Sequence, residues 1–391
     1  MLNNMKNVGV ISMGIKAPIV KEGDDLVKIV VDSVLNATKL GVKMIQPAPN
    51  VKRLVEVPGE YEYNINNKDV IGITESIVAR TQGNYATVDE IAIDVVKKFG
   101  PAATITLIKP IYSRNRFSMI LKGIARAAKH IIFVMPEFDE VGNPKGVNPF
   151  TGVDIQKYYQ EICEKENCTC EFTDWDKPGG LYSDNWVYCG LHDYKQWKES
   201  HTLLSIDKKR YTLANICSDK NSDYGVLGSN KATEEKIKLF PTKEYAKKIV
   251  EEVQKQIAQK TGKIVEVMVY GDGCFHSPSN GKPGSSIWEF ADPVVSPAYT
   301  SGLEGYPNEI KIKAFADDEF KDLSGDELTN AVKQKIKEKD ANLVGNMASQ
   351  GTTPRHYTWL LGSLMDLTSG SGDKGTPFVI VQNYFENYSN N

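Results

Sequence analysis

Two aspartates follow apolar strands at the points where those strands run into polar loops. Asp219 ends the run LANICSD, and Asp272 lies between Gly271 and Gly273 after the run VMVY. Carboxylates at strand ends are hard oxygen ligands that suit Mg²⁺ or Mn²⁺, and glycines allow the backbone to approach an ion or a phosphate closely. The same pattern is typical of aspartates that only form Asx turns, so both interpretations stay open.

A glycine-rich loop near the end of the chain has the composition of an anion-binding turn. The segment SGSGDKG, residues 369–375, offers backbone N–H groups beside the charge of Lys374. Its residue order is not that of a P-loop. The alternative interpretation is a flexible turn between a helix and a strand.

Three side chains near Asp272 could also contact a substrate. His276 follows Asp272 by four positions and is either an acid or base or an ordinary loop histidine. Glu289 and Asp292 either face a substrate amine or carry charge into solvent.

Strands and helices alternate along the segments that would carry these residues. Strands at 102–108 and 130–135 flank the helical segment SRNRFSMILKGIARAAK, which predicts a βαβ unit with a parallel pair of strands. Arg114 and Arg116 begin that helix, where cations oppose the helix dipole, and this favours a role in binding phosphate or carboxylate. The other predicted strands are 7–13, 68–74, 211–217, 263–270, 309–315 and 378–382, and the other predicted helices are 24–39, 153–166, 242–259, 326–338 and 355–367.

Length and charge limit the classes of partner. The chain has 391 residues, enough for two domains, with 47 basic and 50 acidic side chains and a net charge of −3. No basic run predicts a nucleic-acid partner. No stretch approaches the roughly 20 apolar residues of a membrane span, and the first residues lack a signal-peptide core, so a cytoplasmic protein without a membrane partner is expected. The six cysteines predict reduced thiols more than a zinc site.

Five segments resemble, in order, the conserved blocks of the coenzyme F420-0 gamma-glutamyl ligase family. They are GIKAPIVKEGDDL, DVIGITESIVARTQG, YTLANICSDKNSDYGV, VEVMVYGDGCF and TSGSGDKGTPFVIV. The second resembles the family pattern D-V-[LV]-V-[VI]-[TA]-[SQ]-K-[VI]-V-S-K-x-E-G. The resemblance implies a mixed α/β (α+β) fold in two parts that intertwine as a homodimer. It divides this chain into a core part at 1–83, a βαβ-containing insertion at 84–210 and a second core part at 211–391.

The resemblance also implies an activity and its cofactors. Members of the family phosphorylate a substrate carboxylate with GTP, and the amine of L-glutamate then displaces phosphate to give an amide. Two divalent cations, Mg²⁺ or Mn²⁺, take part, and a monovalent cation such as K⁺ assists. For this chain the expected partners are therefore GTP or ATP, a small-molecule acid acceptor and an amino acid such as L-glutamate.

Individual positions match the family's functional residues. Asp219 and Asp272 match metal-binding aspartates with a catalytic role, and Asp373 is a candidate ligand of the second metal. The positions that match nucleotide contacts are Pro18, Ile19, Val20, Lys21, Glu75, Ser76, Arg80, Ser222, Gly370, Ser371, Gly372, Lys374 and Gly375.

Several positions depart from the family pattern. Gly273 replaces a Thr or Ser that helps to hold the second metal, Ser76 stands at a lysine position, and Glu289 stands where an arginine is expected. The acceptor is therefore expected to be altered. A metal-dependent phosphohydrolase and a non-catalytic nucleotide- or metabolite-binding protein are the alternatives to a ligase.

Overall fold

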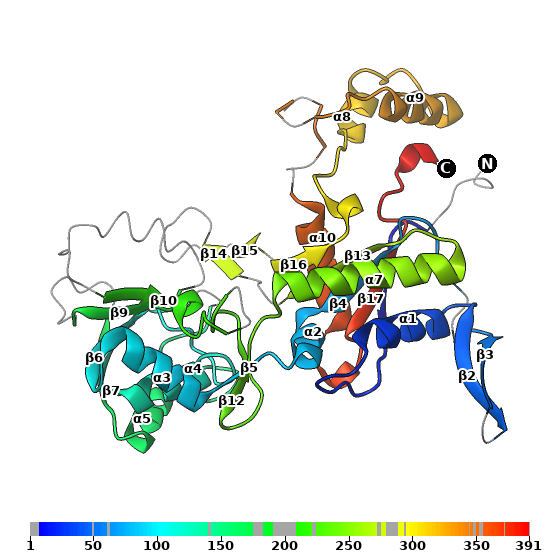
Figure 1. Cartoon of the computed structure of the whole chain (residues 1–391). Coiled ribbons are helices and arrows are strands. Elements are labelled where there is room, and N and C mark those ends of the chain that lie inside the picture. Colours follow the sequence, from blue (N-terminus) through cyan, green and yellow to red (C-terminus); the bar gives the residue numbers. More distant parts are fainter. Residues whose placement is uncertain are drawn as a thin grey trace.

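The computed structural model places the chain in two lobes, with a hairpin and a pair of short helices projecting from one of them (Figure 1). The described residues are 8–48, 51–60, 63–139, 142–174, 183–190, 209–220, 224–271, 275–278, 288–292, 295–343, 345–346, 349–351, 355–370 and 372–390. For residues 41–48, 51–54, 56, 275–278, 288–292 and 295 the description is limited to the backbone. Within these ranges no helix has the length and apolar character needed to cross a bilayer.

The first lobe, called the core lobe, is built on one mixed sheet with the strand order β1-β17-β4-β13-β16. Its strands are β1 (Ile11–Ile15), β4 (Val70–Thr74), β13 (Glu266–Gly271), β16 (Val295–Tyr299) and β17 (Phe378–Gln382). β4 and β13 are parallel, whereas β17 runs antiparallel to β1 and β4, and β16 runs antiparallel to β13. The sheet therefore brings both ends of the chain together with its middle.

Alternate residues of these strands pack on opposite faces of the sheet. Ile71, Val267 and Ile380 share a cluster with the apolar residues of α1 (Leu26–Ala37) and α7 (Lys243–Thr261). Val70 and Val379 pack instead with α10 (Tyr357–Ser369). The core lobe thus has a helical layer on each side of its sheet, and α7 is the long helix in Figure 1.

The second lobe, called the inserted lobe, contains a parallel sheet with the strand order β10-β9-β6-β7-β8. Its elements are α3 (Val88–Phe99), β6 (Ala103–Ile108), α4 (Phe117–Ala127), β7 (Ala128–Met135), α5 (Ile155–Lys165), β8 (Thr169–Asp174), β9 (Asn185–Tyr188) and β10 (Lys209–Thr212). β6, α4 and β7 form the βαβ unit that the sequence predicts. The three helices and the sheet enclose one core that includes Phe117, Phe133 and Tyr159.

A small sheet of short strands joins the lobes. It pairs β11 (Asn230–Lys231) with β12 (Lys236–Lys238), and β12 with β5 (Tyr85–Thr87), which follows α2 (Glu75–Gln82). Leu239 N donates to Asn84 O at 2.9 Å, so the chain's entry into the inserted lobe and its exit lie side by side. The remaining elements are the hairpins β2 (Gly41–Ala48) with β3 (Val51–Val57) and β14 (Phe275–Pro278) with β15 (Trp288–Asp292), and the helices α8 (Ile312–Asp317) and α9 (Gly325–Lys337).

Two predicted strands differ from the structure. The predicted strand 211–217 ends at Thr212, because Thr212 and Asn215 form a capping box that starts a 3-10 turn at Leu213–Asn215. The predicted strand 309–315 is replaced by α8, where Ile312 is exposed, while Ile310 and Phe315 pack in one cluster. β10 crosses the expected domain boundary at 210, and the inserted lobe's core extends to Leu239.

Candidate functional site

A pocket of about 530 Å³ lies at the edge of the core sheet where β1, β4 and β13 end and β17 begins. This edge gathers loops that are far apart in the sequence, because parallel strands end on the same side. The pocket is lined by Ala17, Pro18, Ile19, Val20, Thr74, Glu75, Ser76, Ile77, Arg80, Asn230, Tyr270, Gly271, Asp366, Ser369, Gly370, Gly372, Gly375, Thr376 and Pro377.

The first wall is the corner between β4 and α2. Thr74 N donates to Pro377 O at 3.1 Å, which ties this corner to the start of β17. The chain then turns into α2 with Glu75 in its first turn. Glu75 is only 3% exposed although it lines the pocket, whereas Ser76 and Arg80 are exposed. Three of the predicted nucleotide contacts therefore lie on one wall.

The second wall is the segment that follows β1. Ala17 N donates to Gly375 O at 3.0 Å, and Val20 is buried while Ile19 is 85% exposed. Lys21 N donates to Asp24 Oδ2 at 2.7 Å, and Lys21 is not among the described lining residues. Of the four predicted contacts in this segment, the pocket includes Pro18, Ile19 and Val20.

The third wall is the glycine-rich loop after α10. Gly370 and Gly375 have φ angles of +62° and +67°, which favour glycine, and Thr376 Oγ1 donates to Ser369 O at 2.9 Å to close the loop. A Cβ on Gly370 would lie 2.6 Å from Lys374 Nζ, so the lysine folds back over that glycine. The loop thus brings Gly370, Gly372 and Gly375 to the pocket, while Ser371 lies outside the described residues.

Two carboxylates, Glu75 and Asp366, line the pocket, and the nearby cations Lys238 and Arg116 act on them electrostatically. Burial raises the pKa of the Glu75 carboxyl, and the charges of Lys238 and Arg116 oppose that shift. Burial lowers the pKa of the Lys238 ammonium; Glu75 opposes this change, and the positive charges of Arg80 and Arg116 add to it. Burial also raises the pKa of Asp366, against the charge of Arg116. Arg116, predicted as a substrate-binding cation, therefore acts electrostatically on the pocket.

Sequence reasoning missed Lys238 and Asp366 at this site. Lys238 Nζ donates a hydrogen bond to Ser76 Oγ across 162 positions of sequence, and no local motif announces that contact. Asp366 lies in a helix and reaches the pocket because α10 ends there. Gly271 has a detectable signal, since it precedes Asp272 at a strand end. A Cβ at Gly271 would lie 2.6 Å from Glu75 Cγ and 2.7 Å from Phe240 Cε1, so this position requires glycine.

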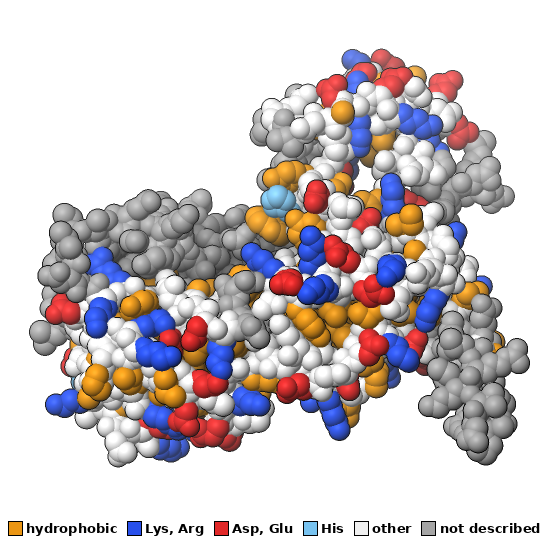
Figure 2. Space-filling view, in the orientation of Figure 1, with side chains coloured by type: hydrophobic (Ala, Val, Ile, Leu, Met, Phe, Trp, Pro, Cys, Tyr) orange, Lys and Arg blue, Asp and Glu red, His pale blue; other side chains and the backbone are white. Residues whose placement is uncertain are grey.

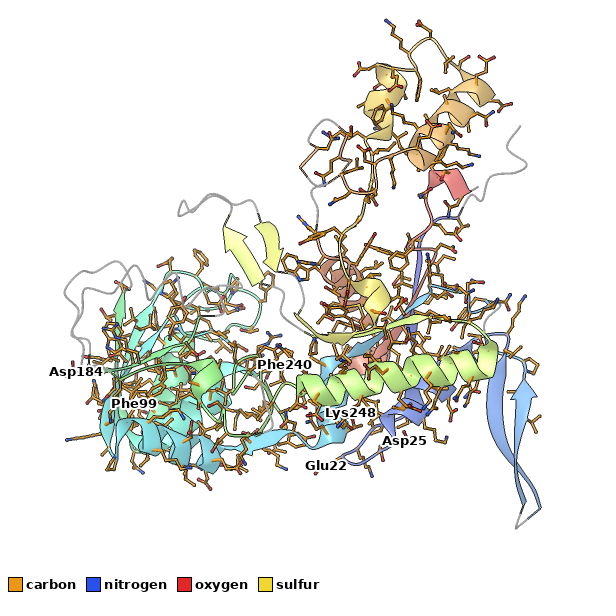
Figure 3. The ribbon with its side chains drawn as sticks, turned by 45° about the horizontal axis from the view of Figure 1, so that its top comes forward. Glu22, Asp25, Phe99, Asp184, Phe240 and Lys248 are labelled. Atoms are coloured by element: carbon orange, nitrogen blue, oxygen red, sulfur yellow. The ribbon has the colours of Figure 1, made fainter. Side chains whose placement is uncertain are left out.

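Phe240 marks the junction of the lobes (Figure 3). Its ring centroid lies 5.5 Å from that of Tyr224, and a Cβ on Gly228 would lie 1.9 Å from the Phe240 ring. The inserted lobe is therefore packed directly behind Gly271, at the rear of the pocket. On the face that Figure 2 shows, positive and negative side chains are interspersed over both lobes.

The predicted metal ligands are only partly described. Asp219 is exposed on the loop after β10, where Cys217 N donates to Asp94 Oδ2 at 2.8 Å and Lys220 pairs with Glu90. Asp219 is not among the described lining residues, and Asp373 is exposed. Asp272, Ser222 and Gly273 lie outside the described residues. In the described part of the chain no three His, Cys, Asp or Glu side chains come together as a metal site.

The other predicted substrate contacts lie on the β14–β15 hairpin. Ser277 and Glu289 are paired across it, and Phe275 and Asp292 form another pair. The side chains of His276, Glu289 and Asp292 lie outside the description, so their roles stay predictions.

A known protein family matches most of the chain. The family described as F420-0:gamma-glutamyl ligase matches residues 14–383. No curated protein matches the chain.

Proposed function

The chain belongs to the F420-0:gamma-glutamyl ligase family, and we propose that it joins an amino acid such as L-glutamate to a small carboxylic acid through an acyl phosphate made from GTP or ATP. The observation that supports the proposal most is the pocket at the end of the core sheet. It combines the segment after β1, the β4–α2 corner and the glycine-rich loop, which are the segments expected to contact a nucleotide.

The proposed reaction has two steps. The carboxylate of the acid attacks the terminal phosphorus of the nucleotide, and the bond to the leaving nucleoside diphosphate breaks. The amine of the amino acid then attacks the acyl carbon, a C–N bond forms, inorganic phosphate leaves with the electrons of the C–O bond, and the proton that the nitrogen loses goes to the departing phosphate. Arg80, which lines the pocket and is exposed to it, would hold phosphate oxygens, because preorganised donors stabilise charge that develops during transfer. Holding all reactants together supplies effective molarity.

A requirement for Mg²⁺ or Mn²⁺ stays part of the proposal. Asp219, Asp272 and Asp373 are the candidate ligands, and K⁺ is the candidate monovalent cation. The described side chains do not form a metal site by themselves, so no step is assigned to a metal ion. Titration of the protein with Mn²⁺, followed by electron paramagnetic resonance, tests the ligands directly: Asp272→Asn is expected to weaken Mn²⁺ binding.

We also propose that the acceptor acid differs from F420-0. Glu289 stands where the family pattern has a cation, and an anion there would repel an anionic substrate group. Arg116 of the inserted lobe, which acts on Glu75 and Asp366, would supply positive charge from another direction. Turnover of F420-0 at roughly 1 s⁻¹ or more would contradict this part of the proposal.

A homodimer is the proposed assembly, by the resemblance to the family. The expected interface is two-fold and buries more than about 2,000 Å², as in obligate dimers. Light scattering checks this: a monomer at micromolar concentration would contradict the proposal.

A single set of incubations separates the candidate functions. The protein is supplied with GTP or ATP, Mg²⁺ or Mn²⁺, a potassium salt, L-glutamate and a panel of coenzyme acids that includes F420-0. Amide detected by mass, with an equal amount of phosphate released, is the expected result. Phosphate without amide would identify a phosphohydrolase, and tight nucleotide binding without either product would identify a binding protein.

A further inference from the structure

Lys238 reaches the pocket wall from the inserted lobe's side of the junction. It ends β12, where it is paired with Tyr85 of β5. Its Nζ donates to Ser76 Oγ, and Ser76 lines the pocket in the first turn of α2. The contact joins two positions that are 162 residues apart, so only the fold brings this ammonium to the pocket.

The environment of Lys238 leaves its charge incompletely compensated. The side chain is half-buried, and it forms no ion pair with a carboxylate in the ranges that the structure describes. Glu75 attracts it from a greater distance, while Arg80 and Arg116 repel it. An ammonium that is partly withdrawn from water and whose hydrogen-bond partner is a neutral hydroxyl is stabilised when an anion approaches it. The arrangement therefore suits an anionic ligand in the pocket.

The position of this ammonium coincides with a departure from the family pattern. Ser76 stands where the pattern has a lysine, and the Nζ of Lys238 lies at hydrogen-bond distance from the Ser76 hydroxyl. The positive charge that a lysine at position 76 would supply is thus supplied by Lys238, from a strand at the junction of the lobes. Arg80, one turn further along α2, adds a second cation on the same wall.

We propose that Lys238 binds the phosphate groups of the nucleoside triphosphate, so that the inserted lobe supplies part of the nucleotide site. This inference rests on the proposed function and names a residue for its phosphate-binding step. A triphosphate fits the wall because Arg80 and Lys238 can share several phosphate oxygens, and the glycine-rich loop at Gly370–Gly375 lines the same pocket. Binding of nucleotide then depends on how the inserted lobe is seated on the core lobe.

The test moves the charge between the two positions. The dissociation constants of GTP, ATP and the corresponding nucleosides are measured by calorimetry with Mg²⁺. Lys238→Met is expected to weaken triphosphate binding about 10- to 100-fold, which is the range of a lost charge-assisted hydrogen bond, and to leave nucleoside binding unchanged. Lys238→Arg should retain most of the affinity. The double variant Ser76→Lys with Lys238→Met should recover triphosphate binding, because the ammonium returns to the same wall from α2.

Lys236→Met is the matched control. Lys236 lies on the same strand, its Nζ is 4.7 Å from the centroid of the Tyr85 ring, and within the described part of the chain it makes no hydrogen bond to a residue that lines the pocket. Its substitution should leave the dissociation constants unchanged. Circular dichroism and thermal unfolding verify that each variant is folded.

Several results would overturn the assignment. Unchanged triphosphate binding in Lys238→Met would do so, and so would an equal loss for nucleoside and triphosphate, which indicates a structural role. Failure of the double variant to recover binding would show that the ammonium acts from β12 only through packing. Weaker F420-0 binding with unchanged GTP and ATP binding would assign Lys238 to the acid.

If the unmodified protein binds neither triphosphate, the assignment fails. If it binds one but makes no amide, the ligase proposal fails while the Lys238 assignment stands.

Discussion

At the scale of single residues, the buried carboxylate of Glu75 destabilises the folded protein when it is ionised. Its carboxylate is 3% exposed and makes no hydrogen bond or ion pair with another side chain in the described ranges. Burial raises the pKa of Glu75 in the folded state, so the unfolded chain loses this proton at a lower pH than the native protein does. Stability from this group is complete below the ordinary pKa of about 4.3 and is lost as pH rises toward the folded value.

Glu75→Gln removes that pH dependence. We expect the variant to be more stable than the unmodified protein at pH 7 to 8, by about 1.4 kcal/mol for each unit of the raised pKa, and the difference to shrink toward pH 4. Urea unfolding at a series of pH values measures it. Glu304→Gln, at an exposed position, is the control and should give no such trend. A stability difference that is constant with pH would show that Glu75 is not desolvated.

Gly271 is a residue whose neighbours leave no room for a larger side chain. The methyl group of Gly271→Ala would meet Glu75 Cγ at 2.6 Å and Phe240 Cε1 at 2.7 Å, and neither atom is at the free end of a flexible side chain. We expect a loss of about 1–3 kcal/mol in the free energy of unfolding, together with weaker nucleotide binding because Glu75 is displaced. Gly372→Ala is the matched control in the same pocket, since its Cβ would meet nothing within 4 Å. Equal stability of the two variants would contradict the expected clash.

At the scale of elements, α3 holds the loop that carries Asp219. Asp94 is 6% exposed on α3, and its carboxylate accepts from Cys217 N at 2.8 Å and from Lys98 Nζ at 2.5 Å. Asp94→Ala would leave a buried N–H without its acceptor, at a cost of about 1–3 kcal/mol. Hydrogen exchange at residues 213–220 should become faster. Asp89→Ala removes an exposed carboxylate from the same helix and should leave that loop unchanged; faster exchange there too would argue against the anchor.

The sequence predicts elements well where one face of the element is buried. β4, β13, β17 and α7 follow strong apolar patterns, and their predicted ranges agree with the structure to within a few residues. Residues 309–315 also alternate, but Ile312 is exposed while Ile310 and Phe315 pack in the cluster with α9, and α8 forms instead of a strand. The alternation of apolar residues along a short segment does not show which of them will pack against the rest of the protein.

The same limit applies to the pocket. Its glycine-rich loop and its β4–α2 corner carry local signals, because special backbone conformations require particular residue types. Lys238 and Asp366 have no such signal. They reach the pocket only because the fold places β12 and the end of α10 there. That placement depends on packing throughout both lobes, which no local sequence pattern encodes.

At the scale of the whole molecule, two separate cores meet at the pocket. The inserted lobe has its own cluster, with residues from Ala86 to Leu239, and the core lobe has clusters on both faces of its sheet. The chain crosses between the lobes at two adjacent points near Asn84 and Phe240, where Asn84 Nδ2 donates to Phe240 O. Because each lobe has its own core, we expect each core to open as a separate unit.

A nucleotide bound by both lobes should couple their opening. Asn230 lies on the inserted segment and lines the pocket, and Lys238 donates to its wall, so unfolding of either lobe would release the ligand. Ligand at 100 times its dissociation constant stabilises the bound state by about 2.7 kcal/mol, which corresponds to a roughly 100-fold slower exchange of amides that open with it. We expect GTP or ATP to slow exchange in β6 and β7, far from the pocket, by a factor close to that in β4 and β13. Hydrogen exchange with mass detection measures both sets at once.

In Lys238→Met, the protection of β6 and β7 should fall more than that of β4 and β13, since the remaining contacts are mainly with the core lobe. Protection confined to β4, β13 and β17 in the unmodified protein would mean that the core lobe binds the nucleotide alone and that the inserted lobe opens independently of it.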